Sequence, residues 1–165
     1  MIKRGTSRVL ILALCIYALI GIVFFFYIRQ AQSDFTEEIT VEINGATTSV
    51  LKIGELNLKP GEDREYAVKL KSRADGEYKI GLNFAETTDG GLKGFIDTEI
   101  TCGGETYTKT LLELLSGEEE IAFICPLKGD VATRIFIHYY MPIEVGNEAQ
   151  GAVADFDVVL TATCT

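Results

Sequence analysis

The chain has 165 residues, of which 47% are hydrophobic and 24% are charged. This balance excludes an intrinsically disordered chain and suits one folded domain with an added membrane or export segment. Residues 34–165 contain 11 of the 15 basic residues and all 24 acidic residues, a net charge of −13. A domain this acidic repels nucleic acids and anionic lipid headgroups, which excludes both as expected partners.

Residues 9–28 read VLILALCIYALIGIVFFFYI and contain no charged side chain. Twenty such residues are enough for a helix to cross a hydrocarbon core of about 30 Å. Three basic residues precede this segment and only Arg29 follows it closely, so the N-terminus is expected in the cytoplasm. The sequence therefore predicts a cytoplasmic N-terminus at 1–8, a transmembrane signal anchor at 9–28, a linker at 29–35 and an extracellular domain at 36–165.

A cleaved signal peptide is the alternative to a retained anchor. Ala31 and Ser33 form the small-x-small pattern that signal peptidases accept, with cleavage before Asp34. The apolar region of a signal peptide usually spans about 7–15 residues, whereas this one is longer and ends in the bulky FFFYIRQ. We favour the retained anchor. Under either reading residues 34–165 lie outside the membrane, and they are secreted if the leader is cleaved.

Beyond the linker, strand patterns recur about every ten residues. Apolar and polar side chains alternate in residues 38–43, which predicts a strand with one buried face. Residues 50–58 form the next apolar run, and KPGED provides a tight turn after it. Residues 64–72 and 77–86 both alternate and are separated by RADG, so we expect them to pair as an antiparallel hairpin.

The second half of the domain continues the pattern with one helical interruption. LLELLSGEEE predicts a helical turn that ends at Gly117. Four further segments read as strands: 92–102, 121–127, 132–142 and 152–164. Seven to nine strands with almost no helix predict an all-β fold, an antiparallel two-sheet sandwich that folds without metal or disulfide.

The four cysteines divide into Cys15, within the apolar segment, and three in the exported part. Export permits disulfides, and three thiols allow one pair. Cys102 and Cys125 both stand near the C-terminal ends of predicted strands, so we take them as the candidate disulfide. Cys164 then remains free or links to another chain. The alternative is that all three are small, reduced, buried residues.

The residues that could carry catalysis are few. His138 is the only histidine, so a two-histidine zinc site cannot be built, and its place in a strand favours a packing role. The exported serines lack a nucleophile elbow. Asp89 and the run 118–120 lack the alternating ligand spacing of a calcium loop. We therefore expect no enzyme activity, no catalytic residues, no cofactor and no metal site.

Two segments resemble the TasA/camelysin family of Gram-positive exported surface and biofilm-matrix proteins. Residues 56–84, with LNLKPGEDREY, are similar to that family's first hairpin, and residues 141–164, with the NEAQG loop, are similar to its closing segment. The residues that carry the resemblance are Leu58, Pro60, Gly61, Asn147, Gln150, Gly151, Phe156 and Ala162. The resemblance implies a jelly-roll-like sandwich, export, and a role in a surface or matrix assembly.

Some members of that family polymerise by giving an N-terminal strand to the next subunit, a form of strand addition. The corresponding candidate here is the segment 36–44. A retained anchor would prevent this segment from reaching a distant subunit, so a membrane-held base or adhesion module fits better than a released fibre subunit. The expected partners are other cell-surface or matrix proteins, or further copies of this chain.

The loop between the last two predicted strands is the second candidate region. Gly146 and Gly151 permit positive φ, and the side chains of Asn147 and Gln150 can hydrogen-bond backbone groups. These four residues form either a corner of the fold or an interaction loop. The alternative functions are an accessory or solute-binding subunit at the membrane, and a camelysin-like metal-dependent peptidase whose metal ligands are missing.

Overall fold

The computed structural model describes residues 36–117, 120–129 and 131–165. The predicted anchor at 9–28 and the linker at 29–35 lie outside these ranges. Among the residues described, no helix has the length and apolar character needed to span a bilayer. Residues 36–165 form a compact unit of their own.

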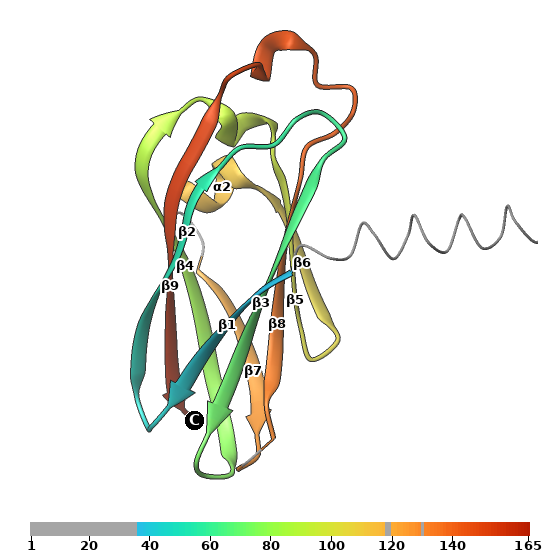
Figure 1. Ribbon diagram of the computed structural model, residues 1–165. Helices are drawn as coiled ribbons and strands as arrows, with labels where there is room; N and C mark the ends of the chain where they lie inside the picture. Colours follow the sequence, from blue (N-terminus) through green and yellow to red (C-terminus); the bar gives the residue numbers. More distant parts are fainter. Residues whose placement is uncertain (1–35, 118–119, 130) are drawn as a thin grey trace, which may run out of the picture. The chain divides into compact units, whose positions relative to one another are not determined.

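Nine strands, one short α-helix and two 3-10 turns make up the described part of the chain (Figure 1). The first strands are β1 (Thr36–Ile43), β2 (Thr47–Leu56), β3 (Asp63–Ser72), β4 (Gly76–Gly90), β5 (Asp97–Cys102) and β6 (Glu105–Thr110). After them come α2 (Leu111–Leu115), β7 (Ile121–Leu127), β8 (Thr133–Tyr140) and β9 (Val153–Cys164). The 3-10 turns are η1 (Leu92–Phe95) and η2 (Asn147–Ala149).

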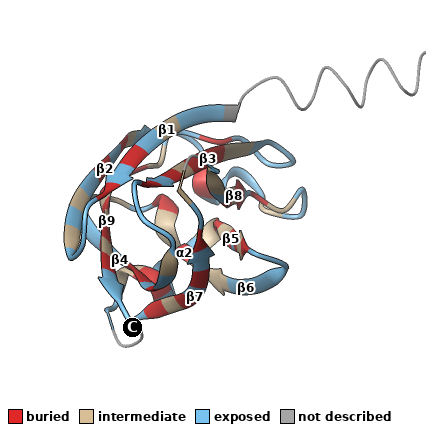
Figure 2. Ribbon diagram, turned by 90° about the horizontal axis from the view of Figure 1, so that it is seen from below, coloured by how far each residue is buried: buried red, intermediate tan, exposed pale blue. Residues whose placement is uncertain are grey.

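The strands form two sheets, which confirms the prediction of a mostly β, two-sheet domain. One sheet has five strands in the order β1-β3-β8-β5-β6, and the other has four in the order β2-β9-β4-β7. Buried and exposed residues alternate along most strands, so each sheet turns its apolar face toward the other (Figure 2). The core therefore lies between the two sheets.

β1 and β3 are parallel, which corrects the expectation of a wholly antiparallel fold. Thr36 lies opposite Glu65, and Ile43 lies opposite Ser72. The reason lies in the path of the chain. After β1 the chain turns at 44–46 into β2 of the other sheet, which runs back before β3 returns to the first sheet. β1 and β3 therefore point the same way.

The predicted hairpin of residues 64–72 with 77–86 is wrong. β3 pairs with β1 and β8, whereas β4 pairs with β9 and β7 of the other sheet. The short turn after Ser72 carries the chain across the sandwich, and the Ser72 hydroxyl and the Tyr78 hydroxyl share a hydrogen bond of 3.3 Å between the two strands. Each strand has one apolar face, and both faces are buried by packing across the core.

Aromatic rings connect the sheets in the middle of the core. Tyr139 of β8 meets Tyr66 edge-to-face at 5.8 Å and Phe156 of β9 at 5.6 Å between ring centroids. All three side chains are almost completely buried. Each such side chain contributes about 1.5–3 kcal/mol through burial, with a smaller addition from the edge-to-face geometry.

The predicted helical turn is confirmed as α2. Thr110 caps it: the Thr110 hydroxyl accepts a hydrogen bond from the Glu113 amide, and the Glu113 carboxylate accepts one from the Thr110 amide. Leu111 and Leu114 enter the core, and Leu112 points to solvent. Two details of the sequence prediction differ: residues 92–95 form η1 rather than part of a strand, and β6 was not predicted.

Candidate functional site

β1 is the first described strand and lies at one end of the five-stranded sheet. Val41 and Ile43 are buried in the core, and Ile39 packs partly against it. The intervening side chains of Glu38, Thr40 and Glu42 lie on the outer face. The alternation predicted for residues 38–43 is thus confirmed, and β1 supplies apolar side chains that the core requires.

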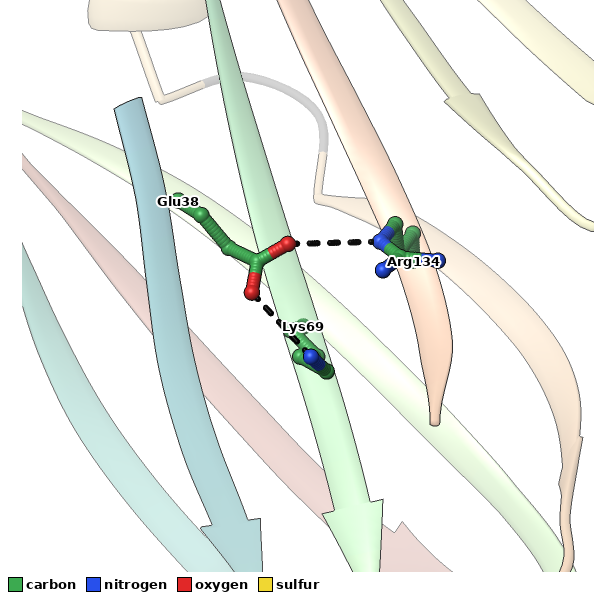
Figure 3. Close-up of polar contacts among 3 residues, drawn as sticks. All are labelled: Glu38, Lys69 and Arg134. Atoms are coloured by element: carbon green, nitrogen blue, oxygen red, sulfur yellow. Dashed lines mark hydrogen bonds and ion pairs between the residues drawn. The ribbon is translucent and has the colours of Figure 1, made fainter. Parts of the chain in front are cut away.

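The outer face of β1 is held by charge (Figure 3). The Glu38 carboxylate accepts hydrogen bonds from Lys69 Nζ on β3 at 3.1 Å and from Arg134 Nε on β8 at 3.4 Å. The hydrogen bond from Lys69, with a smaller contribution from Arg134, lowers the pKa of Glu38 below its ordinary value. Glu38 thereby connects β1 with both β3 and β8. These contacts are exposed to solvent, so each contributes little to the stability of the fold.

The outer edge of β1 pairs with no other strand in the described part of the chain. An edge strand of this kind presents backbone N–H and C=O groups that can accept another strand. β1 has three exposed glutamates, at 37, 38 and 42, and charge on an edge strand discourages unspecific pairing. The segment that the sequence selected for strand addition is therefore a terminal strand of the fold.

The loop from Met141 to Gly151 joins β8 to β9, near the C-terminal end of the sequence. No strand pairing connects it with β1 in the described part of the chain. Its base is braced through the main chain, because the Gly61 amide donates to the Met141 carbonyl at 2.8 Å and the Met141 amide donates to the Glu62 carbonyl at 3.1 Å. Met141 and Ala149 are buried. These two residues fix the loop as a corner of the sandwich.

The four loop residues selected from the sequence point outward. Gly146, Asn147, Gln150 and Gly151 are all exposed. Gly151 has the predicted positive φ, at 76°, whereas Gly146 has an extended conformation with φ −80°. The hydrogen bonds found within the described loop are between main-chain groups, such as the Gln150 amide to the Asn147 carbonyl at 3.1 Å. The amide side chains at 147 and 150 are therefore presented to solvent.

Cys102 and Cys125 come together from opposite sheets. Their sulfur atoms are 2.8 Å apart and both side chains are buried. Cys164 is exposed at the end of β9. The sequence thus selected two thiols that are neighbours in the fold.

His138 lies on β8 of the five-stranded sheet, on the face away from the core, and is partly exposed. Its Nε2 atom is 2.9 Å from an Asp63 carboxylate oxygen, and it stands in register between Glu65 of β3 and Glu99 of β5. The Ser72 hydroxyl is engaged with Tyr78 and the Ala74 carbonyl. No group of three or more potential metal ligands occurs among the residues described.

Comparison with known proteins gives no family assignment. No family model matches the chain, and no curated protein matches it. Solved structures with some likeness include the periplasmic inhibitor of g-type lysozyme, PliG, from Aeromonas hydrophila, with 10% identity over 78% of this chain and 99% of that one and a TM-score of 0.37. A PliG mutant from Escherichia coli has 13% identity over 78% of this chain and 99% of that one, with a TM-score of 0.37.

A third likeness is to dimeric latent PorU from Porphyromonas gingivalis, with 17% identity, a TM-score of 0.29, and 74% of this chain matching 13% of that one. These scores and identities are too low to assign this chain to a fold family or to a function. The functional reasoning below uses the chain's own residues.

Proposed function

We propose that this protein is a non-enzymatic, membrane-anchored extracellular β-sandwich that acts through protein contacts in a cell-surface or biofilm-matrix assembly. Its contacts are made by strand addition at β1. The position of β1 is the observation that supports this most: it is the first strand of the domain, lies at the end of its sheet, and fills the core with Val41 and Ile43.

The pairing of β1 explains how it could serve a neighbouring subunit. Its only strand neighbour in the described residues is β3, and the two share eight register pairs. A β1 strand from another copy would find the same three elements of recognition on β3 and β8: the backbone edge, the pocket for the two apolar side chains, and the cations that bind Glu38. Exchange between copies would therefore preserve every contact and need no new surface.

The resemblance to the TasA/camelysin family supports the surface or matrix role, since segments 56–84 and 141–164 occur in the family's order. The strongly acidic composition supports a protein partner over a nucleic acid. A retained anchor would restrict exchange to copies in the same membrane, so the proposed assembly is a membrane-held one.

Strand exchange can be tested with cysteines at a register pair. Glu42 of β1 lies opposite Lys71 of β3, and both side chains are exposed. We would prepare two full-length proteins, each carrying Cys15→Ala and Cys164→Ser, one with Glu42→Cys and the other with Lys71→Cys. Mixing them under oxidising conditions should yield a heterodimer linked between positions 42 and 71, because only exchanged strands bring these residues together.

The control pairs Glu42→Cys with Glu99→Cys, which lies on the same sheet but on β5, beyond β8. This pair should give little heterodimer. A second control carries both Glu42→Cys and Lys71→Cys in one chain; its internal disulfide should hold β1 in place and prevent assembly until a reductant is added. Equal heterodimer yields at 71 and 99, or assembly of the oxidised double variant, would contradict strand exchange.

A further inference from the structure

The contact between Cys102 and Cys125 connects the two sheets. Cys102 is the last residue of β5 in the five-stranded sheet, and Cys125 lies in β7 of the four-stranded sheet. Their side chains are only 3% and 2% exposed. The distance of 2.8 Å between the sulfur atoms is shorter than non-bonded sulfur atoms ordinarily approach, and a disulfide bond is about 2.05 Å.

The local sequence explains why both side chains face the core. Cys102 occupies a buried position in the alternation of β5 and is followed by Gly103 and Gly104, whose φ values of 60° and 92° form the tight turn into β6. Cys125 occupies a buried position in β7, opposite the buried Tyr78 of β4. Each sheet therefore places one cysteine on its inner face at the same point.

We propose that Cys102 and Cys125 form a disulfide in the mature protein, which covalently joins the two sheets. Ladder hydrogen bonds hold the strands within each sheet, whereas the two sheets are held together by side-chain packing and by the loops that cross between them. The disulfide would link β5, the neighbour of the terminal strand β6 in one sheet, to β7, the terminal strand of the other sheet. The proposal is independent of strand addition at β1.

The bond forms by thiol–disulfide exchange with a low-molecular-weight or protein disulfide as the oxidant. One cysteine thiolate attacks the oxidant's S–S bond to give a mixed disulfide and release one thiolate; the second cysteine then displaces the other. The two cysteines lose two protons and two electrons, and the oxidant's disulfide becomes two thiols. Because both sulfur atoms are buried in the folded domain, this exchange takes place while the sheets are still closing.

The two thiols have different proton affinities. The hydrogen bond to Cys125, together with burial, raises the pKa of Cys102, and the same hydrogen bond lowers the pKa of Cys125. Cys125 is therefore the better thiolate of the pair once the two have come together.

Sheet geometry excludes a bond between Cys125 and Cys164. Both residues lie opposite Tyr78, Cys125 on β7 and Cys164 on β9, so the whole of β4 stands between them. Two strand spacings amount to about 9.5 Å, whereas a disulfide needs Cα atoms within about 7 Å. Cys164 is exposed and remains as the third, unpaired thiol of the exported part.

Peptide mapping tests the proposal on the full-length protein isolated from its cells. The sample is denatured in iodoacetamide without reductant and then digested with trypsin. Cleavage at Lys109 separates the peptide 94–109, which contains Cys102, from the peptide 110–128, which contains Cys125. We expect these two peptides joined, two hydrogens lighter than their sum, and an alkylated Cys164; prior reduction should release both as alkylated peptides.

Alkylation of Cys102 and Cys125 without prior reduction would overturn the proposal, as would either peptide joined to Cys164. Refolding the reduced chain with oxidised and reduced glutathione provides a second test, and the linked peptide should form there too; its absence would count against the proposal. The Cys164→Ser variant should keep the link, whereas Cys102→Ser should lose it and leave Cys125 alkylated, with circular dichroism used to verify that both variants are folded.

Discussion

Tyr139 places a phenol group in the centre of the core. Its ring is buried against Tyr66 and Phe156, and burial raises the pKa of its hydroxyl well above the ordinary value. Within the described residues, neither this hydroxyl nor that of Thr98, its register neighbour on β5, has a hydrogen-bond partner. A buried polar group without a partner costs about 1–3 kcal/mol.

The Tyr139→Phe variant should therefore unfold at the same or a higher urea concentration than the wild type, with a gain of up to about 1–3 kcal/mol. It removes the hydroxyl and keeps the ring contacts. Tyr139→Ala is the matched control, and the cavity it leaves should cost about 3–5 kcal/mol. A clear loss of stability in Tyr139→Phe would show that the hydroxyl has a partner in solution.

The charge of Glu38 determines whether this side chain can form its ionic contacts with Lys69 and Arg134. Its pKa is lower in the folded protein than in the unfolded chain, because Lys69 and Arg134 bind the carboxylate. The contribution of these bonds is therefore complete above the ordinary glutamate pKa, about 4.3, and is lost as the pH falls below it.

We expect the amide resonances next to Glu38 to shift as the pH falls below about 4.3, while the buried side chains of Val41 and Ile43 keep β1 in its sheet. The Glu38→Gln variant should lack these ionic contacts already at neutral pH and show a smaller change of the same resonances on acidification. Two-dimensional NMR of uniformly labelled protein would measure both effects. An identical acid response in wild type and variant would assign the change to other carboxylates.

At the scale of elements, the corner loop combines a structural part with an exposed part. Ala149 is buried in η2, whereas the side chains of Asn147 and Gln150 project outward. The buried residue holds the turn in place, and the two amides are available for contact with another molecule.

Replacing both Asn147 and Gln150 with alanine should change the free energy of unfolding by no more than about 0.5 kcal/mol. Ala149→Asp should destabilise the domain by several times that amount, because it buries a charge. Thermal unfolding would compare the two variants, and cosedimentation with cell envelopes would show whether the alanine pair weakens association. A large stability loss in the alanine pair would mean that these amides brace the fold.

Alternation of side chains predicted most strands but could not assign them to sheets. The pattern in β3 and β4 gave the buried face of each strand correctly, yet a hairpin and a crossover leave the same pattern when both strands bury one face. Strand β6 was missed because all six of its residues are polar or aromatic and none is fully buried. Its Thr and Tyr residues favour a strand, but no apolar residues alternate with them, so the strand has no hydrophobic pattern.

At the scale of the whole molecule, the sequence indicated that two cysteines are neighbours but did not indicate the ionic contacts of Glu38. The two cysteines were selected because both stand near the C-terminal ends of predicted strands, and the fold brings their sulfur atoms together. The ionic cluster on Glu38 was not predicted, since its members are separated by 31 and 96 residues in the chain. Contacts over such distances depend on strand order, which local patterns do not encode.

The parallel pairing of β1 with β3 also determines how the domain bears mechanical load. Tension transmitted through the preceding residues enters the domain at Thr36, the first residue of β1. A pull along the strand acts on all eight register pairs in shear, rather than peeling them apart one after another as in a hairpin opened from its ends. If the domain is held through its N-terminus, all eight β1–β3 pairs would resist an external pull together.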